Sequence, residues 1–278
     1  MDVTDLHGRT ANDEWFTTLC LLMRKSKSHE VDPKGKKTFE ILNHSTIVNM
    51  REPIVSYEKR KLGYKFMAAE AFWILSGRND VKYINKYSDM ICRFSDDGYF
   101  FNGAYGPMIV DQLTYVVNEL IRDKQTRQAV ISIWRPNPRP SKDIPCTISA
   151  QFMVRHGKLH VFDTMRSSDI WLGWPYDVFN FSMLAAYVSL LYKMKTKETL
   201  DLGNLYLTAA SQHLYESDMD EALEVVSDPV MHTPMHFNVH QFENPNQLLQ
   251  WLSILADKKG VIETYVPNEQ TERKQEDN

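Results

Sequence analysis

Apolar positions recur with two different periods along the chain. In the first half they return every three to four residues, which predicts amphipathic helices over 12–25, 62–76 and 107–122. Gly77 follows the second of these at a common position for the end of a helix. Pro107 opens the third, where a missing N–H costs little.

From residue 128 the apolar positions alternate with period two. This pattern predicts strands over 128–135, 146–154 and 158–165, the last two joined by a tight turn at His156-Gly157. The other predicted elements are a polar loop at 26–37, strands near 39–48 and at 200–209, and helices at 177–194, 216–226 and 246–258.

Helices mixed with hairpin strands, without strict alternation of the two, predict an α+β fold. Neither an internal repeat nor a Gly/Ser linker divides the chain, so we expect a single domain over 1–266. The segment 267–278 is polar and lacks periodicity, and we expect it to be a disordered tail.

Composition narrows the class of protein. Hydrophobic residues are 43% and aromatic residues 12% of the 278, enough for a large core and a ring-lined pocket. The formal net charge is −4, which argues against stable binding to nucleic acid, because that affinity comes from clustered Lys and Arg. A few arginines can still build a local site for a small anion.

The three cysteines predict neither a disulfide framework nor a metal site. Cys20, Cys92 and Cys146 are far apart and form no Cys-x-x-Cys pair. The longest apolar run, 183–192, is about half of the ~20 residues that a membrane span needs, and no signal peptide opens the chain. We therefore expect a soluble protein of a reducing compartment, the cytoplasm.

Cys146 is the cysteine best placed for chemistry. It directly follows Pro145, where a proline-rich loop enters a predicted strand, so its thiol can face a cavity at a sheet edge. A thiolate there would be a nucleophile. A small buried hydrophobic side chain is the alternative interpretation.

A second group of residues follows the strand at 158–165. Arg166, Ser167 and Asp169, then a turn with Gly173, present the kinds of group that bind phosphate and orient a polar ring. Taken alone, the same residues also fit a salt-bridged loop. Arg127, before another strand, adds a further guanidinium.

Two acidic residues lie in apolar surroundings. Glu70 shares a helix face with Phe66 and Trp73, so its pKa should be raised, which suits either a proton shuttle or a buried, neutralised carboxyl. Asp177 stands at the start of the apolar helix, where its default role is a helix N-cap.

His213 and Tyr215 can contact a ligand hydroxyl together, although such a pair more often forms a packed edge.

Together these segments resemble the thymidylate synthase family. The matching segments are Arg127 before SIW, Pro145-Cys146, QF (151–152), RSSDIWLGWPYD (166–177), HLY (213–215), EAFWILSG (70–77) and GAYG (103–106). They occur in collinear order over about residues 12 to 226, and the combination is specific although each segment alone is weak. The resemblance implies a large mixed β-sheet flanked by helices and a homodimer formed through the sheet. Residues 1–266 are then the catalytic domain.

The resemblance also implies roles for the individual residues. Cys146 would add to carbon 6 of a pyrimidine nucleotide, making carbon 5 attack the one-carbon unit of 5,10-methylenetetrahydrofolate. Arg166 and Ser167 would bind the phosphate, together with Arg127 from the partner subunit. Asp169 and Gly173 would orient the folate and the base, and Glu70 and Tyr105 would handle protons. His213 and Tyr215 would bind the sugar 3′-hydroxyl.

Asp177 departs from the family pattern, because thymidylate synthases have Asn there. An amide matches uracil, whereas a carboxyl accepts from the cytosine amino group and shares a proton with the ring nitrogen. Asp177 and Thr147, which replaces a common His, both resemble the phage deoxycytidylate hydroxymethylases within this family.

Other departures concern phosphate and folate. Gln128 and Pro33-Lys34 stand where the family has further phosphate arginines, so the lysines at 34, 36 and 37 are candidates to replace them. The segment 91–100 lacks the family's tryptophans, and the tail lacks its closing segment. Weaker closure favours water over hydride in the last step.

The resemblance therefore implies a dCMP 5-hydroxymethylase that uses methylenetetrahydrofolate and water, without a metal. The alternatives are a reductive dCMP 5-methyltransferase, which would yield dihydrofolate, and a thymidylate synthase acting on dUMP. A silent nucleotide- or RNA-binding relative is the alternative from a different class. A modified cytosine nucleotide would suit a virus, acting in the cytoplasm of its host.

Overall fold

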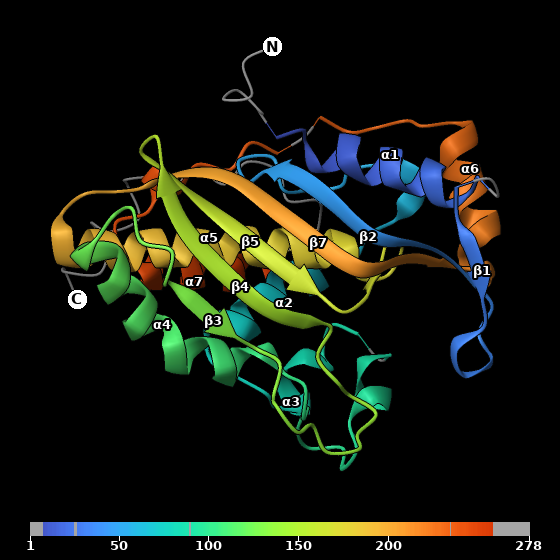
Figure 1. Cartoon of the computed structure of the whole chain (residues 1–278), viewed down its shortest axis with the longest axis horizontal. Helices are drawn as coiled ribbons and strands as arrows, with labels where there is room; N and C mark the ends of the chain where they lie inside the picture. Colours follow the sequence, from blue (N-terminus) through green and yellow to red (C-terminus); the bar gives the residue numbers. More distant parts are fainter. Residues whose placement is uncertain (1–7, 25–26, 89, 234, 258–278) are drawn as a thin grey trace, which may run out of the picture.

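The protein is built on one mixed β-sheet with helices packed against it (Figure 1). The computed structural model describes residues 8–24, 27–88, 90–233 and 235–257. Within them the helices are α1 (Ala11–Leu22), α2 (Tyr64–Leu75), α3 (Val81–Ile84), α4 (Tyr105–Arg122), α5 (Trp174–Thr196), α6 (Met219–Ser227) and α7 (Pro245–Asp257). The strands are β1 (His29–Val31), β2 (Thr38–Asn49), β3 (Val130–Ser132), β4 (Thr147–Arg155), β5 (Lys158–Met165), β6 (Ser168–Asp169) and β7 (Asp201–Tyr215). The predicted α+β class is confirmed.

The described strands follow the order β1-β2-β7-β5-β4-β3, and β6 pairs with β7. The hairpin β4–β5 turns at His156 and Gly157, both with positive φ, as predicted. β5 and β7 are parallel, and a parallel pair needs a long crossover connection. The connection is α5, which lies behind the sheet in Figure 1 and contacts β5 and β7 as well as α2 and α7. Its lack of a polar stripe follows from this burial.

Three element boundaries differ from the prediction in ways that matter for the site. α4 begins at Tyr105, two residues before Pro107. α5 begins at Trp174, with Pro175 fixing φ in its first turn, so Asp177 lies inside the helix and Gly173 occupies the N-cap. The default interpretation of Asp177 as an N-cap is therefore wrong. β7 continues to Tyr215, which places His213 and Tyr215 on a strand.

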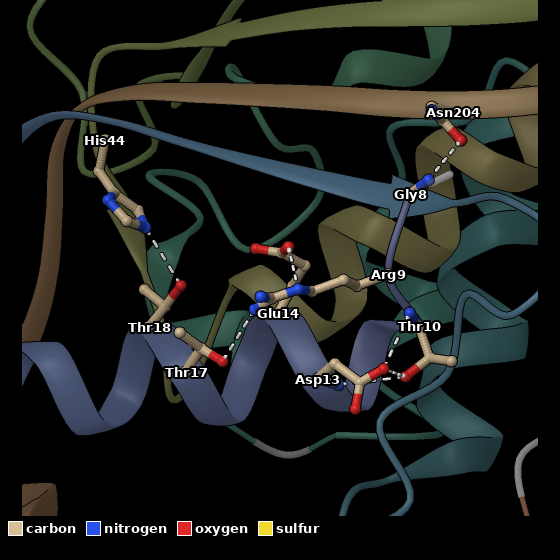
Figure 2. A network of polar contacts seen from close by, with 9 residues as sticks. All are labelled: Gly8, Arg9, Thr10, Asp13, Glu14, Thr17, Thr18, His44 and Asn204. Atoms are coloured by element: carbon tan, nitrogen blue, oxygen red, sulfur yellow. Dashed lines mark hydrogen bonds and ion pairs between the residues drawn. The ribbon is translucent and has the colours of Figure 1, made fainter. Parts of the chain in front are cut away.

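The N-terminal helix is fixed to the sheet by polar contacts (Figure 2). Thr10 and Asp13 form a capping box, and the Gly8 amide donates to Asn204 of β7 at 3.3 Å. One turn after the cap, the buried Trp15 donates from Nε1 to the carbonyl oxygen of Ile170 at 2.7 Å. α1 thereby holds the loop that follows β6, and this loop carries Gly173 and leads into α5, which carries Asp177.

One face of the sheet is open. In Figure 1 no labelled helix crosses in front of β4, β5 and β7. Gln151, Phe162 and Tyr206 lie side by side across these strands and are half-buried. The rings of Phe162 and Tyr206 stack with centroids 4.6 Å apart. The sheet therefore has a core face against α5 and an open face of mixed polar and aromatic side chains.

Among the described residues, no helix is long and apolar enough to cross a membrane. The proposed tail at 267–278 lies outside the described residues.

Candidate active site

The Cys146 thiol lies beside two of the predicted phosphate ligands. Cys146 immediately precedes β4, and its carbonyl accepts from the Arg166 amide at 2.8 Å, which joins it to the end of β5. Its sulfur is 3.6 Å from Arg166 Nη2 and 3.8 Å from Ser167 Oγ. The structure thus brings Cys146 next to Arg166 and Ser167, which lie about twenty positions later in the sequence.

The Arg166 guanidinium is held in place by backbone groups. It donates to the carbonyl oxygens of Ile144 and Pro145 at 3.0 and 2.9 Å, and to Ser167 Oγ at 3.0 Å. Its side chain remains exposed. This arrangement presents a fixed cation beside the thiol, suited to an anionic group of a ligand.

The protein holds Cys146 as a thiol at neutral pH. Burial raises the pKa of Cys146, and the Arg166 charge only partly offsets that rise. The carboxylates of Asp177 and Asp143 raise the pKa of Cys146 further. A bound substrate must therefore be positioned before the small thiolate fraction can react.

Tyr105 lies next to the nucleophile, at the first position of α4. Its hydroxyl oxygen accepts from the Thr147 amide at 3.2 Å, one residue beyond Cys146. Burial raises the pKa of Tyr105 well above its ordinary value, and the Asp177 and Cys146 charges add to the rise. The phenol is therefore a neutral donor near the thiol.

Glu70 is a buried acid with a pKa near neutrality. Burial raises its pKa to about 7, against a hydrogen bond from Asn180 Nδ2 to Glu70 Oε2 of 2.8 Å that lowers it. The expectation of a poorly solvated carboxyl on the face of Phe66 and Trp73 is confirmed. Its partner is a neutral amide, so no cation in the described structure neutralises Glu70.

Asp177 stands at the start of α5, one turn before Asn180. Burial raises the pKa of Asp177 to about 8, and the carboxylates of Glu70 and Asp169 add to the rise. The Asp177 carboxyl is thus mainly protonated at pH 7 and presents one donor and one acceptor.

A glycine keeps the space between two of these acids open. A Cβ on Gly173 would stand 3.4 Å from the Asp169 carbonyl oxygen and 3.5 Å from Asp177 Oδ2. These are ordinary contact distances, so a methyl group would fit the fold but occupy the gap. Gly173 therefore lies in contact range of both Asp169 and Asp177 without adding a side chain between them.

Asp169 is oriented by its own loop. Its Oδ1 accepts from the amides of Trp171 and Leu172 at 2.8 and 3.0 Å. Burial raises the pKa of Asp169, although these bonds and the charges of His213 and Arg60 oppose the rise. The second carboxyl oxygen remains available to a ligand.

His213 and Tyr215 project from the same face of β7. Their rings form an edge-to-face pair with centroids 5.2 Å apart. Tyr215 also lines a cavity of about 630 Å³ together with Lys36 and Lys37, and the Lys36 ammonium lies 5.5 Å from the Tyr215 ring centroid. Two of the three candidate replacement lysines are therefore next to this pair.

Arg127 does not join the cluster around Cys146. Its carbonyl accepts from Gln151 Nε2 at 2.7 Å, five residues along β4 from Cys146, which corresponds to about 16 Å of strand. The Arg127 side chain is exposed.

Sequence reasoning missed three residues of this region. Asn180 was detectable, because a position three residues after Asp177 lies on the same helical face. Arg60 stacks on Trp171, with its guanidinium carbon 4.3 Å from the ring centroid, and is buried behind Asp169. Asp163, on the core face of β5, carried no signal in the sequence beyond a charge within an apolar strand.

Comparison with known proteins agrees with this geometry. Residues 14–270 match the model of the thymidylate synthase family. The chain is 29% identical over 273 residues to a deoxyuridylate hydroxymethyltransferase of Bacillus phage SP01, covering 86% of this chain and 70% of the relative. It is 32% identical over 202 residues to a deoxyuridylate hydroxymethyltransferase of Pseudomonas phage M6, covering 68% of this chain and just over half, 56%, of that relative.

Proposed function

The chain belongs to the thymidylate synthase family, and on that basis we propose that it is a one-carbon transferase that hydroxymethylates carbon 5 of a pyrimidine deoxynucleoside monophosphate. The observation that carries the proposal is a thiol beside two anion-binding side chains, because Cys146 lies next to Arg166 and Ser167. The same site contains two buried acids with raised pKa values, Glu70 and Asp177. The one-carbon donor is 5,10-methylenetetrahydrofolate, a co-substrate, and the catalytic domain spans 1–266.

Cys146 is the proposed nucleophile. The nucleotide phosphate binds Arg166 and Ser167, which brings carbon 6 of the ring to the sulfur, and the thiolate adds there. Addition makes carbon 5 nucleophilic, and carbon 5 bonds to the one-carbon unit. Carbon 5 then releases its proton to solvent, and the electron pair of that carbon–hydrogen bond forms an exocyclic methylene as the carbon–nitrogen bond to tetrahydrofolate breaks. His213 and Tyr215 bind the sugar 3′-hydroxyl from β7, with Lys36 next to them.

Glu70 is the proposed proton carrier, and Tyr105 a neutral hydrogen-bond donor beside the thiol. A group with a pKa of about 7 can accept a proton and return it within one turnover at neutral pH. Asn180 fixes its orientation through the 2.8 Å hydrogen bond.

Asp177 is the proposed reader of the base. A protonated carboxyl donates to ring nitrogen 3 of cytosine and accepts from its amino group. It can also donate to the carbonyl oxygen of uracil and accept from the uracil N–H. An ionised carboxylate only accepts, so above the pKa of about 8 it keeps one hydrogen bond to either base, from the cytosine amino group or from the uracil N–H, and it no longer offers a proton to ring nitrogen 3 of cytosine.

We infer dCMP as the preferred nucleotide. Uracil is matched by a plain amide, without the cost of burying a titratable group. A carboxyl is required only for cytosine, whose ring nitrogen needs a proton as charge develops on thiol addition. Asp177, poorly solvated and without a facing cation among its described neighbours, meets that requirement.

dUMP is the second candidate. The observation in its favour is that both phage relatives are named deoxyuridylate hydroxymethyltransferases. The protonated Asp177 can also pair with uracil near neutral pH. Measurement of the substrate preference therefore distinguishes dCMP from dUMP as the substrate.

The proposed final step is addition of water. The water oxygen bonds to the exocyclic methylene carbon, the electron pair of that double bond restores the ring double bond between carbons 5 and 6, and the bond from carbon 6 to sulfur breaks. The water proton passes to Glu70. Support comes from the relatives' names and from the exposed Phe94, Tyr99 and Phe100 in the segment that lacks tryptophan.

The residues near Gly173 fit the co-substrate. Asp169 has one carboxyl oxygen free of loop hydrogen bonds, and Gly173 leaves an open gap between it and Asp177. Both would orient the folate ring beside the base. The position of the family's closing segment corresponds to the tail at 267–278, which lies outside the described residues.

A homodimer with shared sites is part of the proposal. The open sheet face offers a partner surface, with Phe162 and Tyr206 stacked at its centre. Arg127 is exposed about 16 Å along β4 from Cys146, so it reaches a phosphate more readily in another subunit. We expect mixed Cys146→Ala and Arg127→Ala chains, each inactive alone, to regain activity. Exchanged dimers that stay inactive would mean that one chain builds the site.

The direct test is to incubate the protein with methylenetetrahydrofolate and either dCMP or dUMP, and to weigh the nucleotide product. A 5-hydroxymethyl product supports the proposal. A methyl product with the appearance of dihydrofolate would make the enzyme reductive. No product, and no release of tritium from carbon 5, would favour a binding protein without activity.

A further inference from the structure

Asp163 is a buried carboxyl that the mechanism above does not use. It lies on β5 between Val161 and Met165 on the core face, and opposite Ala150 and Leu207 on the neighbouring strands. Its exposed fraction is 1%, and within the described structure neither carboxyl oxygen has a hydrogen-bond partner. Leaving such groups unpaired is costly, and an aliphatic residue at this position would avoid the cost.

The position of Asp163 relates it to the proposed site. β5 ends at Met165, directly before Arg166, and β5 packs against α5, which carries Asp177. Burial raises the pKa of Asp163 well above its ordinary value, and the Asp177 charge adds to the rise. Burial therefore favours the protonated form of Asp163, which can both donate and accept, beneath the side chain proposed to read the base.

Other buried polar atoms near the site are also unpaired within the described structure. Among them are the hydroxyl oxygen of Thr147 and the amide oxygen of Asn180. Thr147 is opposite Met165, two residues beyond Asp163 on β5, at the point where the register of β4 against β5 shifts between Thr147 and Ser149. Asn180 is one turn beyond Asp177. Buried polar groups without protein partners are commonly paired by ordered water.

We propose that Asp163, Thr147 and Asn180 hold ordered water beneath the base pocket, and that Asp163 acts through this water as a positioning residue for the Asp177 carboxyl. The bound water determines which Asp177 oxygen carries the proton and therefore which base is matched. The inference rests on the proposed function in taking Asp177 as the reader of the base.

Other titratable groups around Asp177 also affect its protonation and therefore the base preference. They are Glu70 from α2, Asp169 from β6, Tyr105 from α4 and the Cys146 thiol. None of them changes in the variants used here, so a change in base preference reports on the water site.

The test compares dCMP and dUMP binding by calorimetry at pH 7 in the full-length protein. Asp163→Val removes both polar atoms, whereas Asp163→Asn keeps a donor and an acceptor. Ser182→Ala is the matched control, because this buried hydroxyl is already satisfied by the Val178 carbonyl of its own helix at 2.7 Å. Thermal unfolding of every variant is measured in parallel.

We expect Asp163→Val to fold with unchanged or higher thermal stability and to change the ratio of dCMP to dUMP affinity by about fivefold or more. Asp163→Asn and Ser182→Ala should stay within about twofold of the wild type. If Asp163→Val does not fold, the isosteric Thr147→Val replaces it, with a smaller change of the same sign expected.

A folded Asp163→Val or Thr147→Val protein with the wild-type affinity ratio would overturn the proposal, as would equal weakening of both nucleotides. Failure of the wild-type protein to bind either nucleotide would overturn the proposed function, and the role of Asp163 with it. The two failures are distinct, because only the second affects the wild type.

Discussion

The two sides of the candidate site differ in how charge is held. On one side, Arg166 is exposed, permanently charged and fixed by the carbonyl oxygens of Ile144 and Pro145. On the other, Glu70 and Asp177 lie in poorly solvated surroundings that raise their pKa values to about 7 and 8. The charge of Arg166 is therefore the same at any ordinary pH, whereas hydrogen bonding to the base depends on whether Glu70 and Asp177 are protonated. Affinity and base preference should respond separately to mutation and to pH.

The largest effect is expected from the nucleophile. Cys146→Ser should lower turnover at least about a thousandfold, because an alcohol is a much weaker nucleophile than a thiolate. Nucleotide binding should persist, since Arg166 and Asp177 are untouched. Product formation and calorimetric binding measure the two properties, and Cys20→Ser is the control on a thiol outside the site. Near wild-type turnover of the serine variant would remove Cys146 from the mechanism.

Arg166→Ala should break the phosphate side alone. Loss of charge-assisted hydrogen bonds should weaken binding of dCMP and dUMP equally, by about 10- to 100-fold. Alkylation of Cys146 should also slow at a given pH, because burial raises the pKa of this thiol and the variant would lose the Arg166 charge that partly offsets the rise. A selective loss of one nucleotide would contradict the separation of the two sides.

A smaller effect should appear in the pH dependence of folding. Burial raises the pKa values of Glu70 and Asp177 to about 7 and 8, so their contribution to stability is fully present below the unfolded pKa values, near 4. This contribution is lost as pH rises through about 7 and 8. The melting temperature should fall by roughly 5 °C or more between pH 6 and 9.

Glu70→Gln and Asp177→Asn should each flatten that decline. Asp80 provides the opposite case, because Arg78 lowers its pKa and its contribution is lost only in acid. A melting temperature that rises from pH 6 to 9 would contradict the placement of neutral acids in the site.

The sequence predicted what local pattern controls. Period-two alternation predicted the β4–β5 hairpin and its turn, and the apolar face of α2 predicted the raised pKa of Glu70. Three-dimensional contacts that join distant segments were not predictable from one sequence. The parallel pairing of β5 with β7, the hydrogen bond from Asn180 to Glu70, and the position of Asp163 beneath α5 all depend on how the layers pack. Pro175 could have placed Asp177 inside α5.

Competition between dCMP and dUMP, measured for the wild type and Asp177→Asn at pH 7 and pH 9, tests the central claim most directly. The wild type should prefer dCMP, and the preference should shrink as pH rises past about 8, because an ionised Asp177 no longer carries the proton that ring nitrogen 3 of cytosine needs. Asp177→Asn should move the ratio toward dUMP by about tenfold or more, without the pH dependence. A wild type that prefers dUMP at both pH values, or a variant with an unchanged ratio, would contradict the reading of cytosine by Asp177.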